Sequence, residues 1–97
     1  MNSTTDAKFP LHLVLRRRRQ ELHLLQADVA EVLHVSPECI TLWEGGRRRM
    51  DIAKLPRIAA ALKMDACELC AKALAEFYPN VYDALFGPHK QLQQKSA

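Results

Sequence analysis

The chain has 97 residues and a formal net charge of +3 at pH 7, a size that allows one domain with a modest stability margin. No apolar stretch approaches the roughly 20 residues that cross a bilayer, and residues 1–8 lack the apolar core of a secretory signal, so we expect a cytoplasmic protein without a membrane segment. Three cysteines, an odd number, argue against a disulfide framework and for reduced thiols.

The basic side chains are concentrated in two runs. Residues 16–19 and 47–49 contain seven of the fourteen lysines and arginines, which leaves seven basic against eleven acidic side chains elsewhere. The positive charge is therefore gathered in two places. Alanine and leucine are plentiful whereas valine and isoleucine are sparse, and this composition favours helices over strands.

An arginine interrupts the apolar stripe of the first predicted helix. Leu11, Leu15 and Leu22 lie on one face of that helix, and Arg19 occupies the position between them. A guanidinium on the core side of a helix must be paired, because burying it alone would cost several kcal/mol. The sequence therefore predicts a carboxylate partner for Arg19.

The most informative stretch is residues 26–46, which predicts two short helices joined by a tight turn. The first, residues 26–33, has an apolar face made of Ala27, Val29, Ala30, Val32 and Leu33. The second, residues 37–44, begins with the N-cap Ser36 and with Pro37 at the first helical position, where the missing N–H costs nothing. Gly45-Gly46 ends it with residues that tolerate positive φ.

The second of these helices has two different sides. Ile40 and Trp43 can be buried, whereas the opposite, outward side carries Pro37, Glu38, Thr41 and Leu42. This is the layout of a helix-turn-helix whose second helix enters the major groove of DNA.

The order of these residues resembles the lambda-repressor-like, or Cro/XRE-type, family of DNA-binding domains over about residues 11–69. The resemblance is carried by Gln26, Ala30, a turn, Val35-Ser36, Ile40, Glu44, Gly46 and the basic run that follows. It implies an all-α bundle of about five helices, here with a short C-terminal helical extension. It also implies that Arg19 pairs with Glu44 in a structural salt bridge.

Two positions depart from the family's pattern. Leu25 stands where the family usually has a hydroxyl or amide N-cap, so the helix after it should begin less firmly. His34 stands where glycine is common, although histidine enters the left-handed region more readily than most residues.

Two further helices and an extension are predicted after the basic run. Asp51 can cap a helix with the stripe Ile52, Leu55, Ile58, Ala59 and Leu62, and Pro56 places its true start near Leu55. Asp65 caps a helix over residues 66–77 with Leu69, Ala73 and Leu74 facing inward. Beyond Pro79, a short apolar helix containing Val81, Tyr82, Leu85 and Phe86 either covers the core or joins two subunits.

The predicted organisation has three parts. Residues 1–9 form a disordered arm, with Phe9-Pro10 at the entry to the first helix. Residues 10–87 form the helix-turn-helix domain with its extension. Residues 88–97 form a flexible tail.

DNA binding needs one set of residues that holds phosphates and another that reads base edges. The resemblance places Gln26 against a phosphate at the amino end of its helix, where free N–H groups favour an anion. We expect the DNA phosphates beside the groove to be bound by Arg47, Arg48 and Arg49. In the first run four successive helical positions point in four directions, so only one or two of Arg16, Arg17 and Arg18 contact phosphate, and we select Arg17.

The predicted base-contacting positions are Ser36, Pro37, Glu38, Thr41 and Leu42. Glu38 can accept from the cytosine amino group, Thr41 can bond either way, and Pro37 or Leu42 can pack on a thymine methyl. A carboxylate near phosphates is a departure from the family, and Glu38 has the alternative role of stabilising the positive end of its own helix. Leu42 has the alternative role of joining the buried side.

The cysteines give only a weak signal. Cys67 and Cys70 form a CxxC pair, but the other potential ligands, Cys39 and the four histidines, show no matching second pair for zinc. Small buried structural cysteines are the favoured interpretation, ahead of a thiol redox switch and of metal. The sequence has no glycine-rich phosphate loop, paired catalytic carboxylates or nucleophile triad, so we expect neither a cofactor nor an enzyme.

These features predict a sequence-specific regulator that binds double-stranded DNA, most plausibly a homodimeric repressor on a palindromic operator. Half-sites would lie about 34 Å, or about 10 bp, apart. Dimer contacts would come from the helix over residues 66–77 and from Tyr82, Leu85 and Phe86. The alternative is a protein-interaction module, or an antitoxin-like protein that binds a protein partner through the same fold.

Overall fold

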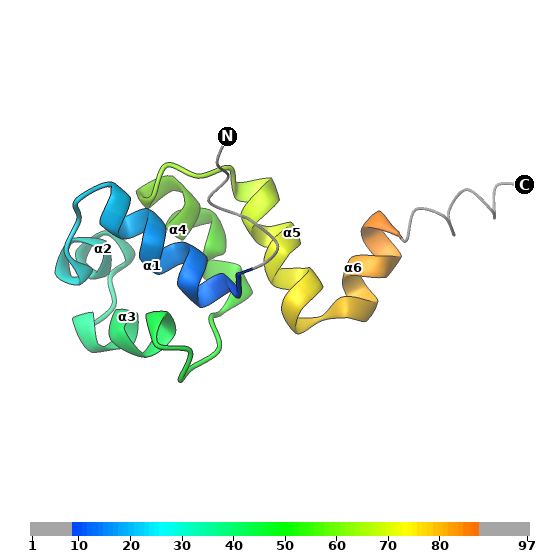
Figure 1. The fold of residues 1–97 in the computed structure, drawn as a ribbon, viewed down its shortest axis with the longest axis horizontal. Helices are drawn as coiled ribbons and strands as arrows, with labels where there is room; N and C mark the ends of the chain where they lie inside the picture. The colour runs from blue at the N-terminus through cyan, green and yellow to red at the C-terminus, as the bar shows by residue number, and fades with distance from the viewer. Residues whose placement is uncertain (1–8, 88–97) are drawn as a thin grey trace, which may run out of the picture.

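The computed structural model describes residues 9–87, and in that range its regular structure is helical (Figure 1). The elements are α1 (Leu11–Glu21), α2 (Gln26–Leu33), α3 (Pro37–Glu44), the 3₁₀ turn η1 (Ile52–Lys54), α4 (Leu55–Ala61), α5 (Ala66–Phe77) and α6 (Pro79–Phe86). The predicted all-α bundle with a C-terminal helical extension is confirmed. No helix in residues 9–87 is long and apolar enough to span a membrane. The predicted arm, apart from Phe9, and the predicted tail lie outside the described residues.

Side-chain caps start three of the elements where the sequence predicts them. The hydroxyl of Ser36 accepts from the N–H of Cys39 at 3.2 Å and starts α3. Asp65 accepts from the N–H of Glu68 at 3.0 Å and starts α5. Asp51 caps η1, which runs into α4 at Leu55, so the predicted start of that helix is confirmed.

The ends of α2 are set by two polar residues. Leu25 is its N-cap and has no acceptor to offer, but the carboxylate of Asp28 accepts from the N–H of Leu25 at 2.8 Å. Asp28 thus satisfies the N–H of the N-cap residue, which is one half of a capping box, while the leucine side chain accepts no hydrogen bond. At the other end His34 has φ 59° and ψ 44°, the left-handed conformation predicted for it.

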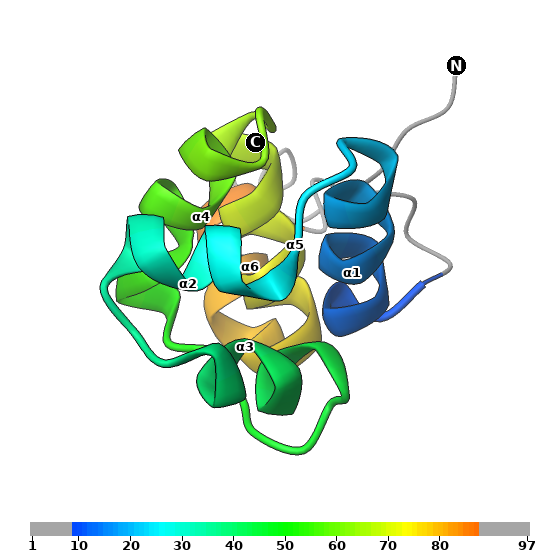
Figure 2. The same ribbon diagram turned by 90° about the vertical axis from the view of Figure 1, so that its left-hand side faces the viewer.

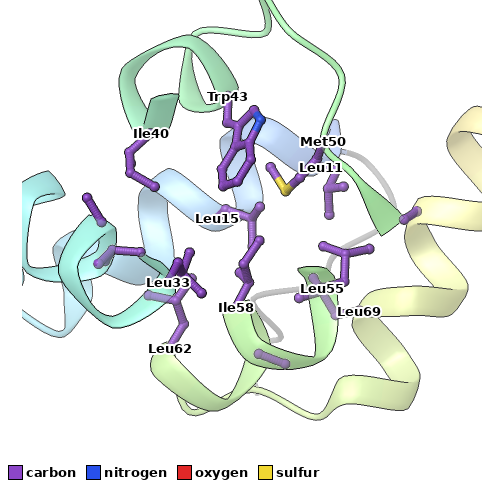
Figure 3. Packing of buried hydrophobic residues seen from close by; sticks show 14 residues of the cluster. Leu11, Leu15, Leu33, Ile40, Trp43, Met50, Leu55, Ile58, Leu62 and Leu69 are labelled. Carbon is purple, nitrogen blue, oxygen red and sulfur yellow. The ribbon is translucent and has the colours of Figure 1, made fainter. Parts of the chain in front are cut away.

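The hydrophobic core draws side chains from α1 to α5 and from the loop after α3 (Figure 3). The loop contributes Met50, which is 4% exposed and which the sequence pattern did not single out. The largest buried members shown in the figure are Leu11, Leu15, Leu33, Ile40, Trp43, Met50, Leu55, Ile58, Leu62 and Leu69.

The predicted apolar face of α2 is too wide. Val29, Ala30 and Leu33 are buried, but Ala27 and Val32 are exposed. At 100° per residue both lie roughly 110° from the centre of the buried arc, one on each side, so a rotation of the helix that buries one of them turns the other further outward.

Two long-range contacts tie the ends of helices together. The N–H of Leu11, at the start of α1, donates to Glu76 Oε1 on α5 at 2.7 Å. Arg18 donates from Nε to the carbonyl of Leu62 at 2.9 Å and from Nη2 to that of Lys63 at 3.1 Å, which satisfies the carboxyl end of α4. Arg18 therefore has a structural role at this helix end that the sequence did not predict.

Helix α6 projects away from the bundle, on the side opposite α2 (Figures 1 and 2). It packs against α5 and contributes no buried residue. Because it projects, the described part of the protein is elongated and measures 51 × 27 × 20 Å along its principal axes. The alternative that this segment covers the core is wrong. Its apolar side chains face solvent in the single chain.

Gly46 tests the geometry of the loop that leaves α3. Its φ is +73°, and a Cβ built there would lie 3.0 Å from the imidazole of His12. We predict that Gly46→Ala lowers the free energy of unfolding by about 2 kcal/mol, from backbone strain and from this contact together. Urea unfolding followed by circular dichroism measures the change.

The His12→Ala background separates the two causes. There Gly46→Ala should cost only about 1 kcal/mol, because the backbone strain remains while the steric contact is gone. An equal loss in both backgrounds would contradict the proposed contact.

Candidate nucleic-acid interface

Helix α3 is anchored by one side and open on the other. Ile40 and Trp43 are 2% and 5% exposed. Ser36, Pro37, Glu38 and Thr41 are exposed, as predicted for the outward side. Leu42 is half-buried, so it partly joins the buried side and partly remains available to pack on a thymine methyl.

The predicted ion pair between Arg19 and Glu44 is present and bidentate. Nε of Arg19 lies 2.7 Å from Oε2 of Glu44, and Nη2 lies 2.9 Å from Oε1. A third donor, Nη1, binds the carbonyl of Leu24 at 2.7 Å. The hydrogen bonds with Glu44 raise the pKa of Arg19 above its ordinary value, although burial opposes them, so the guanidinium stays charged at every pH at which proteins fold.

Gln26 connects this ion pair to the outward side of α3. Its Nε2 donates to Oε1 of Glu44 at 3.0 Å, and its Oε1 accepts from the hydroxyl of Thr41 at 2.7 Å. The carboxylate accepts only, which fixes the orientation of the amide. The side chain of Gln26 is thus held inside the motif with one amide N–H left for an outside partner, and the phosphate contact expected of it stays a prediction.

The basic loop, residues 46–49, begins directly against α3. The N–H groups of Arg47 and Arg48 both donate to the carbonyl of Leu42, at 2.9 and 3.3 Å. Nη1 of Arg48 lies 3.8 Å from the sulfur of Cys39, beside α3. Within residues 9–87 neither arginine forms an ion pair, so both guanidinium groups are available to an anion.

The other two predicted phosphate ligands have aromatic partners. The guanidinium of Arg49 stacks over the rings of Phe77 and Tyr78, at 5.0 and 5.5 Å, where α5 meets α6. Arg17 stacks over Phe9 at 5.2 Å and lies 3.9 Å from Glu21, on the surface of α1. The guanidinium groups of Arg17 and Arg49 are therefore held by cation–π contacts, whereas that of Arg48 lies beside Cys39 of α3.

The CxxC pair separates into two environments. Cys70 is half-buried against the core, and burial, with a smaller contribution from Cys67, raises the pKa of its thiol above the ordinary value. Cys67 is exposed, and of the pair only Cys70, which lies on the apolar stripe of α5, packs against the core. No group of three metal-ligating side chains gathers anywhere in the described residues.

A family model described as a helix-turn-helix domain matches residues 13–71. The match covers more than half of the chain, from α1 into α5, and the chain belongs to this family. No curated protein and no solved structure matches the chain significantly. The family, together with the all-helical fold and the open side of α3, indicates a DNA-binding regulator.

The ion pair can be tested by a double-mutant cycle. We predict that Arg19→Met or Glu44→Leu alone lowers the free energy of unfolding by about 3 kcal/mol, because each leaves a largely buried charge without its partner. The double variant should lose about 2 kcal/mol less than the sum of the single losses. Urea titration measures all four proteins.

Arg17 and Glu21 provide the matched control, since their ion pair is exposed and 3.9 Å long. The same cycle there should give a coupling below about 0.5 kcal/mol. Equal coupling energies for the two pairs would show that burial of Arg19 and Glu44 does not matter.

Proposed function

We propose that the chain is a sequence-specific transcriptional repressor that binds double-stranded DNA as a homodimer at a palindromic operator. The observation that carries the proposal is the open side of α3, which is fixed to the core through Ile40 and Trp43. It is flanked by Arg47 and Arg48, which form no ion pair with the described residues. An exposed helix beside free guanidinium groups suits the major groove and its bordering phosphates. The protein would act in the cytoplasm and by binding, with no catalytic step and no cofactor.

The phosphate contacts come from two places in this proposal. Arg47 and Arg48 hold the backbone beside the carboxyl end of α3. At the amino end of α2 a second phosphate meets the first backbone N–H groups of the helix, before that of Asp28, and the remaining amide N–H of Gln26. Arg49 and Arg17 are secondary, because aromatic rings hold them.

The base-reading side presents mainly acceptors. The hydroxyl proton of Thr41 is directed to Gln26, with the carbonyl of Pro37 as a second acceptor at 3.2 Å, so its oxygen is left to accept. Glu38 also accepts only. Both residues therefore favour bases that offer an amino group in the major groove, cytosine or adenine. Pro37 and the exposed part of Leu42 suit a thymine methyl.

The dimer is assigned to α6. Val81, Leu85 and Phe86 are 44%, 60% and 41% exposed. The ring centroids of Tyr82 and Phe86 lie 4.9 Å apart. A projecting helix with this much apolar surface gains most by burial against a second copy. Two copies would then present two α3 helices to half-sites about 34 Å apart.

A protein-interaction module is the rival function. The carboxylate of Glu38 and the apolar surface of Leu42 would suit a protein partner as well as DNA. The two functions differ in salt dependence and in sequence preference.

We predict that selection from random duplexes enriches a palindrome, and that Arg47→Gln weakens binding to all sequences alike. The slope of log Kd against the logarithm of the salt concentration should decrease by about 1, because one phosphate contact is lost. Glu38→Ala and Thr41→Ala should instead change which sequence is enriched, by about 1 kcal/mol or more of discrimination each.

Lys63→Gln is the matched charge control, since Lys63 is exposed in the turn between α4 and α5. It should leave affinity and slope nearly unchanged. Weak, sequence-blind binding by the wild-type protein would favour the protein-interaction module, and an unchanged preference in both Glu38→Ala and Thr41→Ala would remove the base-reading assignment.

For the dimer, we predict that Leu85→Lys shifts the protein from dimer to monomer at micromolar concentration, because a charge enters the apolar contact. Sedimentation equilibrium measures the mass. Val32→Lys, at an equally exposed apolar residue of α2, is the control and should remain dimeric. A wild-type monomer at this concentration would contradict the assignment.

A further inference from the structure

We propose that the cleft between the basic loop and the carboxyl end of α5 binds a small organic anion with a flat apolar body, and that this ligand opposes DNA binding. The cleft has a volume of about 300 Å³. Its walls come from the start of α1, the end of α3, the loop over residues 46–50 and the end of α5. The effect on DNA rests on the proposed function, whereas ligand binding itself does not.

The cleft carries an excess of positive charge. Arg47, Arg48 and Arg49 all line it, and within residues 9–87 none of them forms an ion pair. The other titratable groups on its walls are His12 and Glu76. One oxygen of Glu76 already accepts from the N–H of Leu11, so a single, partly engaged carboxylate faces three guanidinium groups.

The remaining walls are apolar and partly aromatic. They are formed by Leu11, Trp43, Met50 and Phe77, and Figure 3 shows the first three close together at one end of the core. Arg49 is held over the ring of Phe77, which positions its guanidinium at the edge of this apolar surface. The volume is at the lower end of small-molecule sites, so one or two rings with an acidic group would fill it.

The ligand would compete with DNA because it needs the same donors. Arg47 and Arg48 line the cleft and are also the phosphate contacts of the proposed function. A guanidinium that forms a charge-assisted pair with the ligand is no longer free for a phosphate. Occupancy therefore weakens the DNA complex without any change of fold.

Phenyl phosphate is the probe, since it joins an anion to a flat ring, and the single tryptophan, Trp43, lies in the cleft wall and reports binding by its fluorescence. We expect a saturable change with phenyl phosphate at constant ionic strength. Inorganic phosphate and phenol, the two halves of the probe, should each bind at least about tenfold more weakly. No saturable change with phenyl phosphate, or equal binding of inorganic phosphate, would overturn the proposal.

Two variants shift the affinity in opposite directions. Arg49→Met should weaken phenyl phosphate binding about threefold to tenfold, because a cationic wall is lost. Glu76→Gln should strengthen it about threefold, because the repelling charge is removed while an amide oxygen still accepts from Leu11. Arg57→Met, which removes an exposed guanidinium outside the cleft, should have no effect. Equal affinities in all four proteins would overturn the site.

The regulatory effect is measured by titrating phenyl phosphate into the complex with a selected duplex. The apparent Kd for DNA should rise in the wild type and rise less in Arg49→Met. If DNA binds but Trp43 reports no saturable ligand, the cleft is refuted and the proposed function stands. If the ligand binds but no duplex does, the proposed function and the regulatory effect fail together, while the ligand site is supported.

Discussion

The bidentate ion pair of Arg19 with Glu44 is the interaction on which the rest of the structure depends. Its two side chains are 11% and 7% exposed, so each charge has lost most of its water and requires the other. Gln26 adds a hydrogen bond to the same carboxylate. One carboxylate thus joins α1, α2 and α3, and it fixes the relative placement of the two helices of the motif.

This arrangement connects the interior to the surface that would meet DNA. From Glu44 the hydrogen bonds continue through Gln26 to the hydroxyl of Thr41, which lies on the outward side of α3. From α3 the chain continues into the basic loop, whose first two arginines donate to the carbonyl of Leu42. The polar groups of the candidate interface are therefore pre-organised, Thr41 by the bonds that lead from the ion pair and the basic loop by its bonds to Leu42, which limits the ordering cost of binding.

Most of the helix boundaries could be predicted because their signals are local. Ser36 with Pro37, Asp65, and Pro56 near Leu55 each act within one helical turn of the boundary that they set. The need of Arg19 for a partner could also be predicted, because a charge on an apolar stripe is anomalous within its own helix, whereas Glu44 as that partner was implied by the family resemblance. The amphipathic pattern of α2 was less informative. In an eight-residue helix with five apolar residues, the pattern does not decide which of the five are buried.

The contacts that the sequence did not predict join residues far apart in the chain. Arg18 binds a carbonyl 44 positions away, and Glu76 binds the start of α1 across 65 positions. Neither residue type signals such a partner, because arginine and glutamate on a helix surface are usually solvated. The stacking of Arg49 likewise depends on where α5 ends against α6. The arginines of the two basic runs therefore have different roles, some structural, some stacked on rings and some free, and only the structure distinguishes these roles.

The most direct measurement of the central claim is the change in backbone amide NMR shifts when the protein is titrated with its selected duplex. If the ion pair presents α3 to the major groove, the largest changes will fall at the start of α2, on residues 36–42 and on Arg47 and Arg48, while the amides of α6 will keep the shifts of the free dimer. Changes concentrated on α6, with α3 unaffected, would contradict the account.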